Sequence, residues 1–116
     1  MNTMTIKPEL TWVSVCKASD LTPNTGVCAL VNGKQVAIFH CQRSGNLYAI
    51  DNFDPLGKAN ILSRGIIGSI EGEPYVASPL YKQHFHLRTG ACLEEPEIQI
   101  PTYSIRTIEG EVQVQA

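Results

Sequence analysis

The sequence has little charge, no long apolar run and no segment resembling an export signal. Charged residues make up 17% of the chain and the formal net charge is −2, so neither nucleic acid nor an anionic membrane is expected as a partner. No apolar stretch approaches the roughly 20 residues of a transmembrane helix. The N-terminal MNTMTIKPEL lacks the apolar core of a secretory signal. We therefore expect a cytoplasmic protein.

Recognisable catalytic and cysteine motifs are missing as well. Cys16, Cys28, Cys41 and Cys92 are widely spaced, with no Cys-x-x-Cys pair, and in a reducing compartment they are expected to be free thiols. There is no Gly-x-Ser-x-Gly, no His-Glu-x-x-His and no glycine-rich phosphate loop. We predict no catalytic residue in this chain.

What the sequence does contain is a regular series of short strand patterns. A chain of 116 residues with 43% hydrophobic content predicts one globular domain, residues 1–116. No window holds a long helical period, and Gly and Pro recur every few residues, which favours an all-β sandwich or barrel of antiparallel sheets. Trp12 is a candidate for its core. The expected strands are residues 11–16, 27–31, 34–40, 47–50, 66–70, 75–77, 84–87, 98–100, 103–108 and 111–114.

The clearest local prediction is a hairpin around Asn32-Gly33. Asn-Gly suits the two positive-φ positions of a type I′ turn. With a two-residue loop, Cys28 lies opposite Ala37 and not opposite Cys41. A disulfide between Cys28 and Cys41 is therefore not expected.

Two loops, residues 52–65 and 78–83, carry a resemblance to a known family. LYAIDNFDPLGKANILSRGII and YVASPLYKQHFHLRTG resemble the two cluster-binding loops of Rieske ferredoxin domains, and the resemblance extends over nearly the whole chain from Trp12 onward. It implies the small Rieske-type β fold, with both loops at one tip. The loops of that family supply two Cys and two His to a two-iron centre.

The ligand positions of those loops hold other residues here. The two Cys positions fall at Asp54 and Ser78, and the two His positions at Leu56 and Tyr81. No Cys or His occurs anywhere between Gln42 and Gln83, so a shift of register does not restore the set. Sulfur and imidazole suit such a centre, whereas a carboxylate, an aliphatic group, a hydroxyl and a phenol do not. We expect no metal and no cofactor in this chain.

A Rieske frame with changed ligand positions resembles the small subunits of NAD(P)H-dependent assimilatory nitrite reductases. Residues 51–55, 62–65 and 77–80 carry this similarity. It implies a large partner subunit that holds FAD, siroheme and an iron–sulfur cluster and reduces nitrite to ammonia. Two alternatives remain open: an electron-transferring Rieske-like ferredoxin with an unconventional metal site, and a free-standing binding module of another redox system.

Without a cluster, the apolar residues of the loops are expected to pack over its space, and the alternative is that some of them stay exposed as a docking patch. A basic rim could guide association with an acidic surface, although the same cations could simply be solvated. Asp51 is expected to belong to the frame, and Asp54 to hold a turn. The docking candidates are Phe53, Leu56, Lys58, Arg64, Leu80, Tyr81 and Lys82, with Arg88 as a further basic residue.

His84 and His86 alternate along one predicted strand and so share a face. Two imidazoles on one face could begin a zinc site, but a structural zinc site commonly needs four Cys or His ligands. The simpler interpretation is a pair of ordinary strand histidines.

Overall fold

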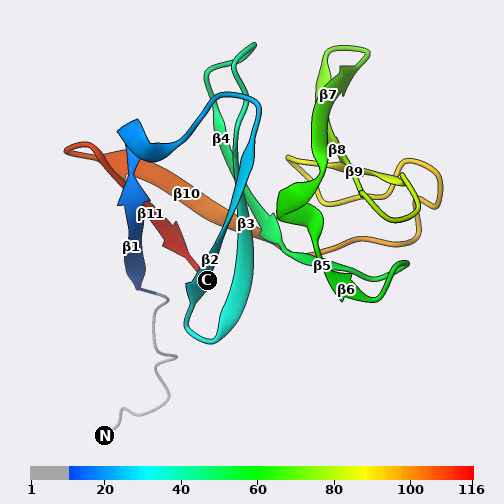
Figure 1. Cartoon of the computed structure of the whole chain (residues 1–116), viewed down its shortest axis with the longest axis horizontal. Coiled ribbons are helices and arrows are strands. Elements are labelled where there is room, and N and C mark those ends of the chain that lie inside the picture. The colour runs from blue at the N-terminus through cyan, green and yellow to red at the C-terminus, as the bar shows by residue number, and fades with distance from the viewer. Residues whose placement is uncertain (1–10) are drawn as a thin grey trace, which may run out of the picture.

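The structure is a computed structural model that describes residues 11–116 (Figure 1). The first ten residues of the predicted domain, including the segment MNTMTIKPEL, lie outside the described residues. The described chain is built from strands and two short 3₁₀ turns, which confirms the all-β prediction. The elements are β1 (Trp12–Lys17), η1 (Ala18–Asp20), β2 (Gly26–Val31), β3 (Lys34–His40), β4 (Leu47–Asp51), β5 (Phe53–Asp54), β6 (Ala59–Asn60), η2 (Leu62–Arg64), β7 (Ile66–Ile70), β8 (Glu73–Ala77), β9 (His84–His86), β10 (Thr102–Ile108) and β11 (Glu111–Gln115).

Six antiparallel strands form the first lobe, in the order β1-β11-β10-β4-β3-β2. The sheet curls so that its edge strands β1 and β2 come near each other, which gives a near-barrel (Figure 1). Its β2–β3 hairpin turns at Asn32 (φ 50°) and Gly33 (φ 80°), the left-handed pair that a type I′ turn requires. Cys28 lies opposite Ala37, so the predicted register is confirmed.

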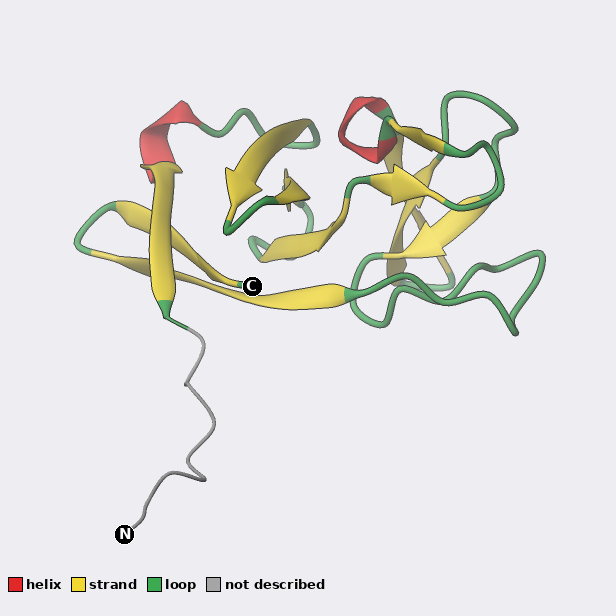
Figure 2. Ribbon diagram, turned by 90° about the horizontal axis from the view of Figure 1, so that it is seen from below, coloured by secondary structure: helices red, strands yellow, loops and turns green. Residues whose placement is uncertain are grey.

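The second lobe contains a three-stranded sheet, β7-β8-β9, and the small hairpin β5–β6. It lies at the far side of β3 and β4 from β1 (Figures 1 and 2). Two loops end this lobe, residues 53–58 and residues 78–82, and we call them the tip loops.

The wall between the lobes is β3, which is buried on both faces. Val36 and Ile38 point into the barrel core, and Ala37 and Phe39 point into the core of the second lobe. All four side chains are fully shielded from solvent. A strand covered on both faces reads as a continuous apolar run, with no alternation, and this explains the sequence VAIF.

Three expectations need correction. Residues 98–100 form no strand, because only Gln99 makes a bridge, to Ala91. The loop at residues 52–65 is not structureless, since it contains β5, β6 and η2. Trp12 is only half-buried, and the guanidinium of Arg106 lies 4.1 Å from the centre of its ring. This cation–π contact holds the ring at the barrel surface.

Candidate functional site

The two positions where the family resemblance places cysteines are joined by a hydrogen bond. The hydroxyl of Ser78 donates to Oδ2 of Asp54 across 2.5 Å. Both side chains are almost completely buried. We call this contact the Asp54–Ser78 bond. It links the starts of the two tip loops, so it connects the places that a cluster would bridge.

The other carboxylate oxygen of Asp54 organises the first tip loop. Oδ1 accepts from the backbone N–H groups of Leu56 (2.9 Å) and Gly57 (3.0 Å). The carboxylate therefore holds the turn that follows it, as the residue pattern predicted. Buried carboxylates are tolerated when their oxygens are paired in this way, and here each oxygen has a donor.

The two positions where histidines would stand behave differently from each other. Leu56 is partly buried and packs against the core of the second lobe. Tyr81 is 65% exposed. Of these two side chains, one thus packs inward and the other is exposed to solvent.

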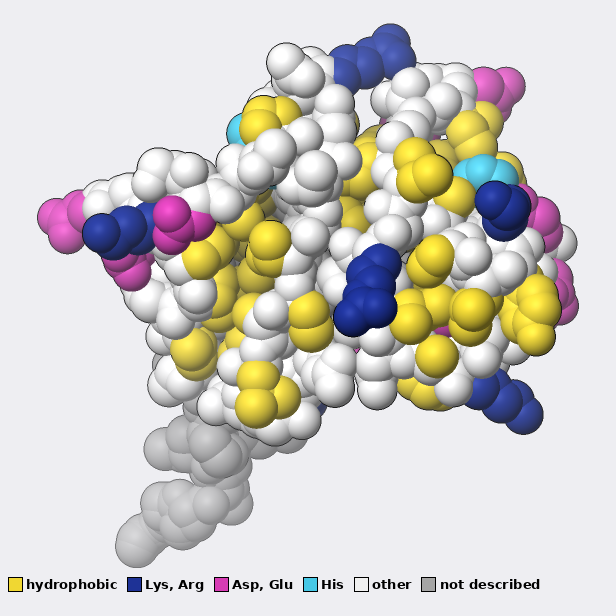
Figure 3. All heavy atoms as spheres, viewed as in Figure 1, with side chains coloured by type: hydrophobic (Ala, Val, Ile, Leu, Met, Phe, Trp, Pro, Cys, Tyr) yellow, Lys and Arg dark blue, Asp and Glu magenta, His cyan; other side chains and the backbone are white. Residues whose placement is uncertain are grey.

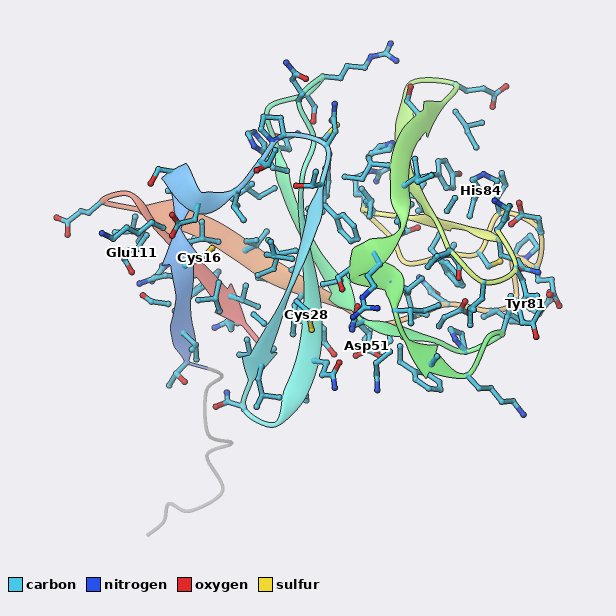
Figure 4. All side chains as sticks on the ribbon, in the orientation of Figure 1. Cys16, Cys28, Asp51, Tyr81, His84 and Glu111 are labelled. Carbon is cyan, nitrogen blue, oxygen red and sulfur yellow. The ribbon has the colours of Figure 1, made fainter. Side chains whose placement is uncertain are left out.

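Exposed apolar side chains gather around the tip loops. Phe53 is 38% exposed and Leu80 is 50% exposed. Figure 3 shows yellow side chains grouped over this end of the molecule, with dark blue basic and magenta acidic groups at the margins, and Figure 4 places Tyr81 at the outer end. Lys58 and Lys82 are exposed on the same loops.

The remaining basic candidates lie away from the tip loops. Arg64 is exposed on η2, on the side where the Ser63 carbonyl comes close to Gly26 of β2. Arg88 donates to Glu73 across 2.8 Å. Of the basic side chains considered for a rim, only Lys58 and Lys82 belong to the tip loops themselves.

His84 and His86 each bind a separate carboxylate. Nδ1 of His84 lies 2.6 Å from Glu94, and Nε2 of His86 lies 2.7 Å from Glu73. Nδ1 of His86 accepts from the amide of Arg88 (3.0 Å), so the ring proton must lie on Nε2 and is donated to Glu73. Within residues 11–116, no three Cys, His, Asp or Glu side chains converge as metal ligands.

Two carboxylates near these histidines have shifted pKa values. The hydrogen bond from Arg88, followed by that from His86, lowers the pKa of Glu73. Burial raises the pKa of Glu94, but the hydrogen bonds from the amide and ring of His84 outweigh it and the net shift is downward. Both acids therefore hold their histidines as structural partners of β9.

Asp51 is the last residue of β4 and adjoins the second lobe, where it makes a structural contact. Its Oδ1 is 3.5 Å from the hydroxyl of Tyr103. Burial raises the pKa of Asp51, although the contact with Tyr103 opposes the shift. The structure does not bring Asp51 and Asp54 together as an acid–base pair: Asp54 is committed to Ser78 and to its own turn.

Two further observations bear on the type of protein. No helix formed by residues 11–116 is long and apolar enough to cross a bilayer. All four cysteines are free, and the Cys28–Ala37 pairing in the hairpin accounts for the absence of a Cys28–Cys41 bond.

Comparison with known proteins gives a consistent result. Residues 11–115 match the family described as Rieske-like [2Fe-2S] domain. The NADH nitrite reductase small subunit of Salmonella typhimurium is 47% identical over 103 residues, covering 89% of this chain and 95% of that protein. The solution structure of the Escherichia coli protein NirD has a TM-score of 0.84 and 43% identity, covering 91% of this chain and 96% of that one.

A third relative places the same domain inside a larger polypeptide. The NAD(P)H nitrite reductase large subunit of Klebsiella oxytoca is 36% identical over 108 residues. The match covers 92% of this chain but 11% of that protein. In that enzyme a segment similar to this chain is part of the large subunit itself.

The residues at the former ligand positions do not fit the cluster named in the family description. Leu56 offers no donor atom, and the carboxylate of Asp54 is already bonded to Ser78 and to two amides. An iron–sulfur centre of this type is held by Cys and His. The tip is thus a closed hydrogen-bonded structure.

Proposed function

The chain belongs to the family of nitrite reductase small subunits built on a Rieske-like domain, and from this we propose that it binds the large subunit of an NAD(P)H-dependent nitrite reductase and supports the reduction of nitrite to ammonia there. It is part of an oxidoreductase and contributes no catalytic residue of its own. The FAD, siroheme and iron–sulfur cluster of the reaction belong to the large subunit in this proposal, and the complex is cytoplasmic.

The Asp54–Ser78 bond is the observation that carries the proposal. A buried carboxylate and a hydroxyl 2.5 Å apart hold the two loops together by the chain's own side chains. The tip keeps its shape without a metal, whereas the electron-carrier alternative requires one. A rigid tip with exposed apolar residues suits a subunit that acts by contact.

The large-subunit relative supports the choice of partner. A segment similar to this chain is covalently part of that enzyme. A domain that is fused in one protein and separate in another is expected to work against the same neighbouring surface, because the fused copy is held beside it permanently.

We further propose that the tip is the contact surface. Phe53, Leu80 and Tyr81 supply apolar contact, and Lys58 and Lys82 supply charge. Leu56 supports the surface from below, since it packs inward. Arg64 lies at the flank on η2 and would contact only a partner that extends over β2.

The test is reconstitution. The large subunit is assayed for NAD(P)H-dependent nitrite reduction with and without this chain, and iron is measured in this chain alone. We expect activity to depend on the chain, co-purification of the two proteins, and less than about 0.1 iron per chain. A brown preparation with two irons per chain would contradict the proposal, and so would a large subunit that neither binds the chain nor responds to it.

A further inference from the structure

The two tip loops repeat one five-residue pattern. Residues 54–58 read Asp-Pro-Leu-Gly-Lys, and residues 78–82 read Ser-Pro-Leu-Tyr-Lys. The geometry repeats too: the N–H of Lys58 donates to the carbonyl of Asp54 (2.6 Å), and the N–H of Lys82 donates to the carbonyl of Ser78 (3.0 Å). Each loop is one closed turn that begins at a former cysteine position and ends at a lysine.

Both lysines have the same uncommon backbone conformation. Lys58 has φ 56° and Lys82 has φ 63°, in the left-handed region that a residue with a Cβ adopts at a cost. Asn32, Glu71 and Glu109 also have positive φ, but each precedes a glycine at a hairpin turn. Glycine would close the tip turns with less strain, so the turns themselves give no reason for a lysine.

The Asp54–Ser78 bond joins the two turns at their first residues. In each turn a backbone hydrogen bond joins the first residue to the fifth, which is the lysine. The bond between the two first residues therefore also positions the backbone of both lysines. Lys58 and Lys82 are therefore held at equivalent ends of two linked turns, one on each loop.

The middle of the repeat differs between the loops, and the difference creates the apolar centre. Leu56 packs inward, whereas its counterpart Leu80 stays half-exposed and lies over Gly57, where a Cβ would come within 2.7 Å of Leu80 Cδ1. Gly57 corresponds to Tyr81, so the small residue of one loop makes room for the leucine of the other. The exposed apolar side chains of the two loops are Phe53, Leu80 and Tyr81, and we call them the apolar centre.

The exposed charge of the tip loops has one sign. Lys58 and Lys82 are exposed, and the only acid in residues 53–58 and 78–82 is Asp54, which is buried and hydrogen-bonded. The chain as a whole carries −2. The two loops themselves are therefore positive, although Glu94 lies close to the second loop through its hydrogen bonds to His84. Electrostatic attraction would orient the loops toward an acidic surface.

We propose that Lys58 and Lys82 form a lysine pair that flanks an apolar centre of Phe53, Leu80 and Tyr81, and that this surface docks on an apolar recess with acidic margins on the large subunit. The proposal rests on the proposed function, because it takes the large subunit as the occupant. It adds the chemistry of the partner's surface and divides the contact into a charged part and an apolar part.

The charged part is tested by binding of the full chain to the purified large subunit at several salt concentrations. The variants are Lys58→Glu, Lys82→Glu and the double variant, with Lys17→Glu on β1 as the control. We expect each single change to weaken binding about tenfold at low salt, and the double change by roughly a hundredfold with a flatter salt dependence. Lys17→Glu should stay within about twofold of the wild type.

The apolar part is tested with Leu80→Asp, against Ile66→Asp on β7 as a matched control, because Ile66 is also an exposed aliphatic residue. Leu80→Asp should weaken binding at least about thirtyfold at every salt concentration, while Ile66→Asp should have little effect. Circular dichroism and urea midpoints of each variant confirm that the fold is kept.

The outcomes separate the two levels of the proposal. Wild-type chain that fails to bind the large subunit overturns the proposed function and the docking surface with it. Wild-type chain that binds, together with a double lysine variant that binds within twofold of it, overturns the lysine pair alone. Equal losses for Ile66→Asp and Leu80→Asp overturn the assignment of the apolar contact to the tip.

Discussion

At the scale of single residues, Asp54 is a buried carboxylate in the tip that needs hydrogen bonds to replace the water it has lost. Its carboxylate is buried and accepts from the Ser78 hydroxyl and from the amides of Leu56 and Gly57. Each donor replaces water that burial removes, so the loss of any one leaves an unsatisfied group. The side chain occupies a position where a Rieske domain has a cluster ligand.

Substitution at the Asp54–Ser78 bond should destabilise the free domain. We expect Asp54→Ala to lower the free energy of unfolding by about 3 kcal/mol and Ser78→Ala by about 2 kcal/mol, because each leaves buried polar partners unpaired. Urea unfolding followed by fluorescence measures the change. Ser19→Ala, at an exposed serine in η1, should be neutral. Stability unchanged in both tip variants would contradict the role given to the bond.

The left-handed lysines predict the opposite effect on stability. Lys58→Gly and Lys82→Gly should each stabilise the free domain by about 1 kcal/mol, because glycine adopts positive φ without strain. The same variants should bind the large subunit more weakly, since the charge is lost. Thermal unfolding of the free chain measures the first effect. A drop in melting temperature would show that the side chains support the turns.

Sequence reasoning at this scale identified the four former ligand positions but not how they are used. The residue types alone predict that no cluster is bound, because donor chemistry can be read without coordinates. That Leu56 packs inward while Tyr81 stays exposed is a matter of three-dimensional packing, which the spacing of residues does not show. The five-residue repeat of the two loops is present in the sequence, but its structural significance follows only from the matching hydrogen bonds.

At the scale of elements, the β8–β9 pair is held by a set of charged contacts. Glu73 on β8 receives hydrogen bonds from His86 on β9 and from Arg88 just beyond it. His86 also packs edge-on against Tyr75, with ring centres 4.9 Å apart. These contacts fix the strand that follows the second tip loop.

Acid should weaken this pair in a defined direction. The pKa of Glu73 in the folded state is lower than its ordinary value of 4.5, first because of Arg88 and then because of His86. Stability from the ionised carboxylate is therefore present above about 4.5 and is lost as the pH falls through the lower folded value. Glu73→Gln should flatten the acid limb of a stability–pH curve measured by urea unfolding. The neighbouring exposed Glu71→Gln should leave that limb unchanged.

The elements predicted correctly are those with a strong local signal. Asn32-Gly33 determined a hairpin and its register by turn geometry alone. The strand predicted at residues 98–100 does not form because the amides that would extend the Ala91–Gln99 bridge are used locally: that of Ile98 bonds to the carbonyl of Glu95, and that of Gly90 bonds to the carbonyl of His86. Strands β5 and β6 have two residues each, too short for an alternating pattern to be recognised.

At the scale of the whole molecule, two cores share one wall. The barrel core includes Val112 and Val114, and the core of the second lobe includes Phe85 and Val76. Strand β3 contributes side chains to both. The sequence predicted the fold class through its resemblance to a family, but nothing in its periodicity indicated two cores, because a run such as VAIF is equally compatible with one.

A change in one lobe should therefore be detected in the other. Trp12 is the single tryptophan and lies on β1 of the barrel, whereas Phe85 is fully buried in the second lobe. Phe85→Ala should lower the stability reported by Trp12 fluorescence by about 3–4 kcal/mol, through the cavity and the shared wall. Two separate transitions, with the Trp12 midpoint unchanged, would show independent lobes.

The double burial of β3 also limits how the protein can be divided. A fragment that contains only the second lobe would expose one row of β3 side chains to water. A fragment that contains only the barrel would expose the other row. Neither piece would keep a covered core. Peptides copied from the tip loops would lose the scaffold that holds their turns, so inhibitors that imitate this surface would have to be whole domains.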